Sequence, residues 1–193
     1  MPIAINGSGT ITGVSVGGLP DGIVDTDMIA ADAVTAAKVG TKTFTSYAII
    51  CDEKAAGTDG GDFSASTWVT RDLNTEIADP DSIVSIASNQ FTLGAGSYLI
   101  EAVATAKEVN RHIARIYNAT STSVVAYGMS AHASSGGSVT DTATVTARVT
   151  ITGNTAFEIQ HWCQSSRTTY GLGFANDASV VNKYTTVKIF KEA

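Results

Sequence analysis

The first 40 residues of this 193-residue chain contain no phenylalanine, tyrosine, tryptophan, histidine or cysteine. Aromatic side chains bury the largest area per residue, so this segment cannot build a hydrophobic core by itself. Its aliphatic side chains are nevertheless spread along its whole length, which is unusual for a disordered tail. We therefore expect residues 1–42 to be ordered by association with copies of themselves. The candidate contacts are Ile11, Val14, Val16, Leu19, Ile23, Met28, Ile29, Val34 and Val39.

Positive charge and long apolar runs are also scarce. The 18 acidic residues outnumber the 12 lysines and arginines, which gives a net charge of -6. Nucleic acids and anionic membranes require basic surface, so neither is the expected partner. No apolar run of about 18 residues occurs, and no basic stretch followed by an apolar one opens the chain. We expect neither membrane insertion nor secretory export.

The chain has only two cysteines, Cys51 and Cys163, which lie far apart in the sequence. One long-range disulfide is possible. Two buried thiols in a reducing cytosol are the favoured interpretation.

Leucine is scarce as well, with 5 residues against 17 valines, 16 isoleucines and 26 threonines. β-branched side chains suit strands, so the composition indicates an all-β protein. Alternation of apolar and polar residues is clearest over residues 138–152, where a period of two predicts a long strand with one buried face. Further strands are expected at residues 43–51, 67–73, 91–93, 97–107, 111–118, 123–127, 156–164 and 183–191. That many strands without a convincing helix indicate a sandwich or jelly roll.

Paired catalytic carboxylates do not emerge from the pattern. Hydrolysis of a glycosidic bond needs two acids that face one cleft. Glu101 and Glu158 are the only glutamates within predicted strands, and an exposed face or an ion pair with an arginine explains both. Acidic loop residues at positions 25–27 and 59–62 offer oxygen ligands for calcium but lack the spacing of an EF-hand, so turn chemistry is favoured and a loop calcium site is the minor alternative.

Histidine and cysteine do not form a recognisable metal site either. His161 and Cys163 are two residues apart on one predicted strand, so their side chains share a face. A zinc site needs three or four ligands, and His112 or His132 could join them only through the tertiary fold. We predict that the protein is not an enzyme and has no catalytic residues, no metal and no cofactor.

Three long connections rich in small residues are expected at residues 54–66, 130–137 and 165–179, and such loops often carry recognition. The last one combines aromatic, amide and charged side chains among glycines, a mixture that suits sugar binding. Its receptor-binding candidates are Arg167, Tyr170, Phe174, Asn176 and Asp177. Packing of the Tyr170 and Phe174 rings against the core explains these two aromatic residues equally well.

Two tryptophans, Trp68 and Trp162, lie inside predicted strands. For these side chains a place in the core or in a subunit contact is favoured over ligand stacking.

Several stretches resemble a known family. Residues 94–102 (GAGSYLIEA) and 109–118 (VNRHIARIYN) resemble the central strands of C1q/TNF-like jelly rolls found in phage virion fibres. Residues 91–98 and 157–161 resemble further strands of that fold, and residues 32–39 (DAVTAAKV) resemble the shaft segments of phage tail fibres. The resemblance implies a homotrimer with heads packed around a threefold axis, intertwined or particle-bound N-terminal segments, and no catalytic residues.

The combined prediction is a non-enzymatic structural protein of a bacteriophage particle, located in the virion and assembled in the host cytoplasm. Residues 1–42 would form a trimerisation and anchoring segment, and residues 43–193 a C1q/TNF-like jelly-roll head. As a homotrimeric fibre or spike, it would bind other virion proteins and a glycan or protein on the host surface. The main alternative is a capsid decoration or head-fibre (cement) protein whose N-terminal arm binds the capsid. A glycan-degrading tailspike and a cellular C1q-like adhesin are further alternatives.

Overall fold

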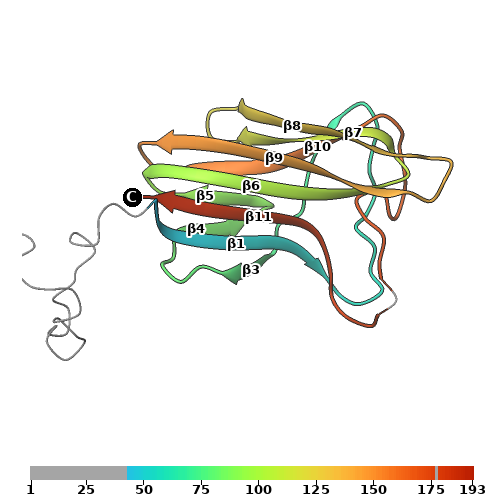
Figure 1. Cartoon of the computed structure of the whole chain (residues 1–193), viewed down its shortest axis with the longest axis horizontal. Coiled ribbons are helices and arrows are strands. Elements are labelled where there is room, and N and C mark those ends of the chain that lie inside the picture. Colours follow the sequence, from blue (N-terminus) through green and yellow to red (C-terminus); the bar gives the residue numbers. More distant parts are fainter. Residues whose placement is uncertain (1–42, 177) are drawn as a thin grey trace, which may run out of the picture. The chain divides into compact units, whose positions relative to one another are not determined.

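The computed structural model describes residues 43–176 and 178–193, and all regular elements in these residues are β-strands (Figure 1). The strands are β1 (Phe44–Lys54), β2 (Trp68–Thr70), β3 (Thr75–Ala78), β4 (Val84–Ala87), β5 (Gln90–Leu93), β6 (Gly96–Lys107), β7 (Asn110–Asn118), β8 (Ser123–Ala133), β9 (Thr140–Ile151), β10 (Thr155–Cys163) and β11 (Asn182–Glu192).

The strands form two antiparallel sheets that face each other. One sheet has the order β3-β1-β11-β6-β9 and the other the order β4-β5-β10-β7-β8, with β2 paired to β10. From β5 onward the chain crosses between the sheets at almost every connection, which is the winding of a jelly roll. The predicted fold class, an all-β jelly-roll sandwich, is confirmed.

The core lies between the two sheets and is built from every second residue of each strand. On β6, Tyr98, Ile100, Ala102 and Ala104 are all buried, and their neighbours in sequence face outward. The alanine side chains of this strand are therefore packed inside the sandwich. Within the second sheet, Phe91 of β5 and its cross-strand partner Phe157 of β10 are both buried and stack at a centroid distance of 5.6 Å.

Each predicted strand overlaps a strand of the structure, but two predicted boundaries are wrong and two short strands were not predicted. The strand predicted at residues 67–73 is limited to β2, because the chain leaves the sheet after the Arg71 amide donates to the Ile159 carbonyl. The connection predicted at residues 130–137 begins too early, because β8 continues to Ala133, which pairs with Asn110. The short strands β3 and β4 were not predicted at all.

Both cysteines are buried free thiols in different sheets. Burial raises the pKa of Cys51 and raises that of Cys163 to about 11. The favoured interpretation of two buried thiols agrees with these positions.

The predicted segment 1–42, with its nine candidate contacts, lies outside the described residues, and so does Asp177. Their proposed roles therefore stay predictions. Over the described part of the chain, no helix has the length and apolarity needed to cross a membrane.

Candidate recognition and association surfaces

Two of the predicted loops pair with each other at one end of the sandwich, opposite the C-terminus (Figure 1). The backbone of Phe63 exchanges two hydrogen bonds with Arg167, of 2.8 and 3.0 Å, and Gly61 bridges to Tyr170. Phe63 itself is buried beneath this junction. The loop after β1 and the loop after β10 therefore form one structural unit.

A fully buried arginine fixes this unit to the core. Arg71 donates through Nη2 to the carbonyls of Leu172 (2.8 Å) and Tyr184 (3.1 Å). Its Nε donates to Thr185 Oγ1 at 2.7 Å, and its Nη1 to the Thr105 carbonyl at 3.2 Å. Burial lowers the pKa of Arg71 to about 10, although the charges of nearby aspartates act in the opposite direction. Four oxygen acceptors thus satisfy a buried cation and hold the second loop in place.

The aromatic residues of the second loop surround a lysine. Lys107 Nζ lies 3.4 Å from the centroid of Phe174 and 5.3 Å from that of Tyr170. The two rings meet edge to face at 5.5 Å. Lys107 is buried, whereas Phe174 is 51% exposed. One face of Phe174 is therefore occupied by a cation, and much of the remaining ring lies in solvent.

Arg167 and Tyr170 are held by an acidic residue. Glu108 Oε2 lies 2.8 Å from Arg167 Nη2 and accepts a 3.3 Å hydrogen bond from the Tyr170 hydroxyl. These contacts favour the interpretation that the two side chains stabilise the loop.

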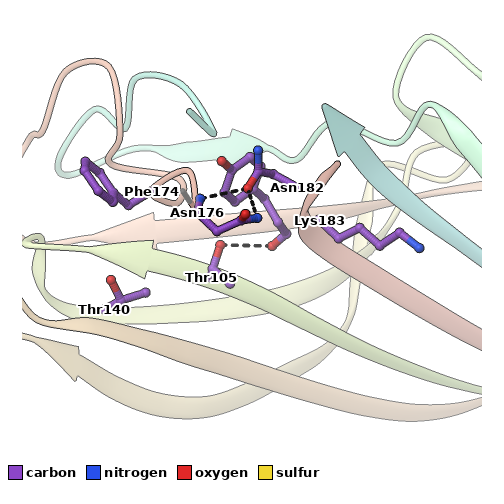
Figure 2. A pocket seen from close by; sticks show the side chains of 7 residues that line it. Thr105, Thr140, Phe174, Asn176, Asn182 and Lys183 are labelled. Atoms are coloured by element: carbon purple, nitrogen blue, oxygen red, sulfur yellow. Dashed lines mark hydrogen bonds between the residues drawn. The ribbon is translucent and has the colours of Figure 1, made fainter. Parts of the chain in front are cut away.

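Asn176 also has an internal role. Its backbone N–H donates to Asn182 Oδ1 at 2.9 Å, and its own Oδ1 accepts from the Ala178 amide at 2.9 Å. Figure 2 shows Asn176 and Asn182 beside a pocket of about 160 Å³. The pocket is lined by Thr105, Thr140, Phe174, Asn176, Asn182, Lys183 and Tyr184. Its volume is below the range of about 300–1,000 Å³ that is typical of drug-sized ligand sites.

Four of the five receptor-binding candidates are thus gathered at one end of the sandwich. Phe174 and Asn176 are exposed, while Arg167 and Tyr170 are half-buried, and Arg167, Tyr170 and Asn176 make contacts within the loops. Their role in receptor binding stays a prediction.

The two strand-borne glutamates are not paired. Glu101 is on the outer face of the β6 sheet, opposite Lys188, and Glu158 is on the outer face of the β10 sheet. Since the core separates these faces, the two carboxyl groups cannot flank one glycosidic bond. Burial raises the pKa of Glu158, but hydrogen bonds from Thr70, Gln90 and Gln160 outweigh it and lower the pKa.

The fold does bring two histidines together. His112 Nδ1 and His161 Nε2 are 3.0 Å apart between the sheets, and both rings are buried. Burial lowers the pKa of His112 to about 4 and that of His161 well below its usual value. His132 lies apart from them on the exposed side of β8. Among the described residues, no group of three or more histidine, cysteine or acidic side chains could hold a metal ion.

A different kind of surface covers the outer face of the β1-β11-β6-β9 sheet. Tyr47, Phe190 and Leu99 occupy one row across three neighbouring strands, as their Cα pairing shows. Phe44 packs against Phe190 with ring centroids 5.2 Å apart, and Val103 is exposed farther along β6. An apolar row of this kind on a sheet face is typical of a surface that another protein covers.

These features define an all-β jelly-roll sandwich with a row of apolar side chains on one outer face. No protein-family model matches the chain, and no curated protein matches it. Among solved structures, the globular domain of zebrafish complement 1qA protein is similar, with a TM-score of 0.47 and 15% identity. That comparison covers 76% of this chain and 96% of the complement domain. Murine APRIL is also similar, with a TM-score of 0.47 and 6% identity over 76% of this chain and 98% of APRIL. Both solved structures have a C1q/TNF-like jelly-roll fold. The jelly-roll fold of this chain is defined by its own strand order in the two sheets.

Proposed function

We propose that the chain is a non-enzymatic structural protein of a bacteriophage particle, a homotrimeric fibre or spike whose jelly-roll head attaches to the host surface. The observation that carries the proposal is the apolar row of Tyr47, Phe190 and Leu99 on an outer sheet face. Copies of the same chain are the proposed occupants of this face.

The energetics favour covering this face. Tyr47 is 44% exposed and Val103 is 42% exposed, so each has apolar area still to bury. Complete burial of a large apolar side chain gives about 1.5–3 kcal/mol, and partial burial gives a share of it. Several such contributions, repeated in each copy, are enough to offset a substantial part of the entropy of association.

A closed ring of three subunits needs two different patches, because each subunit contacts its neighbours through different surfaces. The second patch that we propose is the edge formed by β8 and β9, where Met129 is 73% exposed. A groove beside it is lined by Met129, Thr144 and Thr146, and also by Tyr127, which we leave outside the proposed contact. Insertion of this edge against the apolar row of the next subunit would close the ring.

The position of β1 supports a link between the head and the preceding segment. Phe44, the first residue of β1, packs on Phe190 at the margin of the apolar row. In a trimer assembled through this face, the three N-terminal segments would start near one another. Their effective concentration would then favour association of segments that cannot build a core alone.

The paired loops support an attachment role for the other end. β1 runs away from Phe44 and ends at Lys54, where the first loop begins, so the loops lie at the end of the sandwich remote from Phe44 (Figure 1). If the N-terminal segments attach the protein to the particle, the paired loops would face away from the particle.

The test is the mass of the full chain in solution by light scattering. We expect about three times the chain mass of 19.9 kDa. Leu99→Asp should yield a folded monomer, because it places a charge in the apolar row. Thr92→Asp is the matched control on the outward side of β5 in the other sheet, and it should leave the trimer intact. A monomeric natural protein would refute the trimer.

Particle labelling separates the two virion assignments. Fluorescently labelled trimer that binds host cells supports attachment. Binding to purified capsids without binding to cells would instead identify a decoration protein and contradict the attachment role.

A further inference from the structure

A second aromatic surface lies on the outer face of the sheet that contains β10. Trp68 on β2 pairs in register with Trp162 on β10, and Gln160 of β10 pairs with Arg115 of β7, which pairs with Tyr127 of β8. Both tryptophans are only partly buried, which places them on this outer face and not in the core.

An arginine is held between the rings of this surface. The Arg115 guanidinium carbon lies 3.9 Å from the centroid of Trp68 and 5.1 Å from that of Tyr117. Its Nε and Nη2 donate to Gln160 Oε1 at 2.8 and 2.6 Å. The Trp68 and Tyr127 rings pack against each other beside it, with their centroids 5.9 Å apart and their planes at 45°. Tyr127 is 61% exposed, so much of its ring lies in solvent.

The nearest carboxylate does not neutralise this arginine by direct contact. Glu158 Oε2 accepts from Thr70 Oγ1 at 2.9 Å and from Gln160 Nε2 at 2.7 Å, and its Oε1 accepts from Gln90 Nε2 at 2.8 Å. Neutral donors therefore surround the carboxylate, and Gln160 separates it from Arg115. The guanidinium is oriented by the amide and keeps its charge for another partner.

The charge of this face also differs from that of the whole chain. Arg111 and Arg115 both point outward from β7, because His112, Ala114 and Ile116 between and beside them are buried. Two guanidinium groups thus accompany one carboxylate on a chain whose net charge is -6. An acidic partner complements this face better than it complements the rest of the surface.

We propose that the surface formed by Trp68, Arg115, Tyr117 and Tyr127 binds an acidic glycan. The negative face of an aromatic ring attracts the partly positive C–H bonds of a sugar ring, and the exposed ring of Tyr127, supported by Trp68, offers such a face. The oriented guanidinium of Arg115 pairs with a sugar carboxylate. Because stacking and hydrogen bonds already fix these side chains, little conformational entropy is lost on binding. This inference deepens the attachment step of the proposed function and assigns it to a sheet face instead of the loops.

The test uses the full chain and oligogalacturonate as the acidic probe, with maltooligosaccharide of similar length as the neutral comparison. Binding is followed by quenching of tryptophan fluorescence and by calorimetry at low and high salt. We expect oligogalacturonate to bind more tightly than maltooligosaccharide, and its affinity to fall as salt increases.

Two variants examine the surface, and a third is the control. Tyr127→Ala and Arg115→Gln should each weaken oligogalacturonate binding by a factor on the order of ten. Tyr127→Ala removes an exposed ring and is the variant that least endangers folding. Ile77→Ala, which changes an exposed apolar side chain on β3 of the other sheet, is the control and should leave the affinity unchanged, and Phe174→Ala examines the paired loops as the alternative site.

Three results would overturn the inference. The first is a natural protein that does not bind oligogalacturonate, and the second is a loss of binding in Phe174→Ala without loss in Tyr127→Ala. The third is a Tyr127→Ala protein that dissociates into monomers, since this face would then be a subunit contact. Light scattering on the same samples separates the two proposals, because a trimer that ignores the probe overturns only the inference.

Discussion

Acid should weaken the head through its buried histidine pair, and the geometry gives the size of the effect. His112 Nδ1 and His161 Nε2 share one hydrogen bond of 3.0 Å, which requires one nitrogen to donate and the other to accept. Their remaining nitrogens, His112 Nε2 and His161 Nδ1, have no hydrogen-bond partner among the described residues. The arrangement therefore suits two neutral rings, and a proton added to the pair finds no acceptor nearby.

The direction follows from the pKa in each state. An unfolded histidine has a pKa of about 6.5, whereas burial lowers the pKa of folded His112 to about 4. Below pH 6.5 the unfolded chain binds more protons than the folded one, so stability is present above that pH and is lost as the pH falls toward 4. The pKa of His161 is also lowered by burial, so it acts in the same direction.

Between pH 7 and pH 5, linkage gives a loss of about 2 kcal/mol for His112, whose side chain is fully buried. His161 adds a loss in the same direction, because burial lowers its pKa as well. The loss for His112 alone is a substantial share of the roughly 5–15 kcal/mol that stabilises a typical domain.

Urea denaturation of the full chain at pH 7, 6 and 5, at one fixed protein concentration, measures the loss. The variant with His112→Leu and His161→Phe should lose less than about 1 kcal/mol over the same range. His132→Asn, which changes an exposed histidine outside the pair, is the matched control and should behave like the natural protein. Burial raises the pKa of Asp52, which opposes the effect equally in all three proteins. A double variant as acid-sensitive as the natural chain would refute the reasoning.

Two further predictions concern the packing of the head. Gly173→Ala should lower the melting temperature by roughly 4–8 °C, which corresponds to about 2 kcal/mol. Gly173 has a φ of +144°, and a Cβ there would lie 2.0 Å from a tyrosine ring atom of β11, whereas Gly153→Ala, in open space, is the silent control. Cys51 and Cys163 should resist iodoacetamide at pH 8 in the folded protein and react fully in urea, because burial raises the pKa of both thiols. Alkylation of either thiol at the rate of a free peptide would show that it is accessible.

Strands with a long alternating pattern could be predicted from the sequence, and strands without one could not. β9 was evident because Val145 and its alternate neighbours are apolar while the intervening residues are mostly threonine. β3 has four residues and owes its existence to backbone pairing with β1, at Ile49, Ile50 and Cys51. No periodicity can develop over so few residues, so only the partner strand reveals such an element.

The recognition surfaces depend even more on the tertiary arrangement. The composition of the loops indicated recognition. Their pairing with each other, however, depends on backbone hydrogen bonds such as those between Phe63 and Arg167, and residue types do not reveal such bonds. Trp68 and Tyr127 are far apart in the chain, and only the order β2-β10-β7-β8 brings their rings together. Arg71 follows a strand like an ordinary surface arginine, and nothing in its sequence neighbourhood indicates complete burial.

The distribution of buried polar groups gives the two ends of the head different properties. The fully buried Arg71 and the pair His112 and His161 all lie toward the paired loops, whereas Phe91 and Phe157 fill an apolar interior toward the other end. Apolar packing is insensitive to pH, while a buried imidazole pair and a buried guanidinium depend on the protonation of their surroundings. Acid should therefore loosen the loop end first, because the local free energy of opening is lowest where these polar groups are concentrated. In a trimer joined through the apolar row, the subunit contact would then persist at a pH that already disturbs the paired loops. Hydrogen exchange at pH 5 would show faster opening in the paired loops than in β1 and β11.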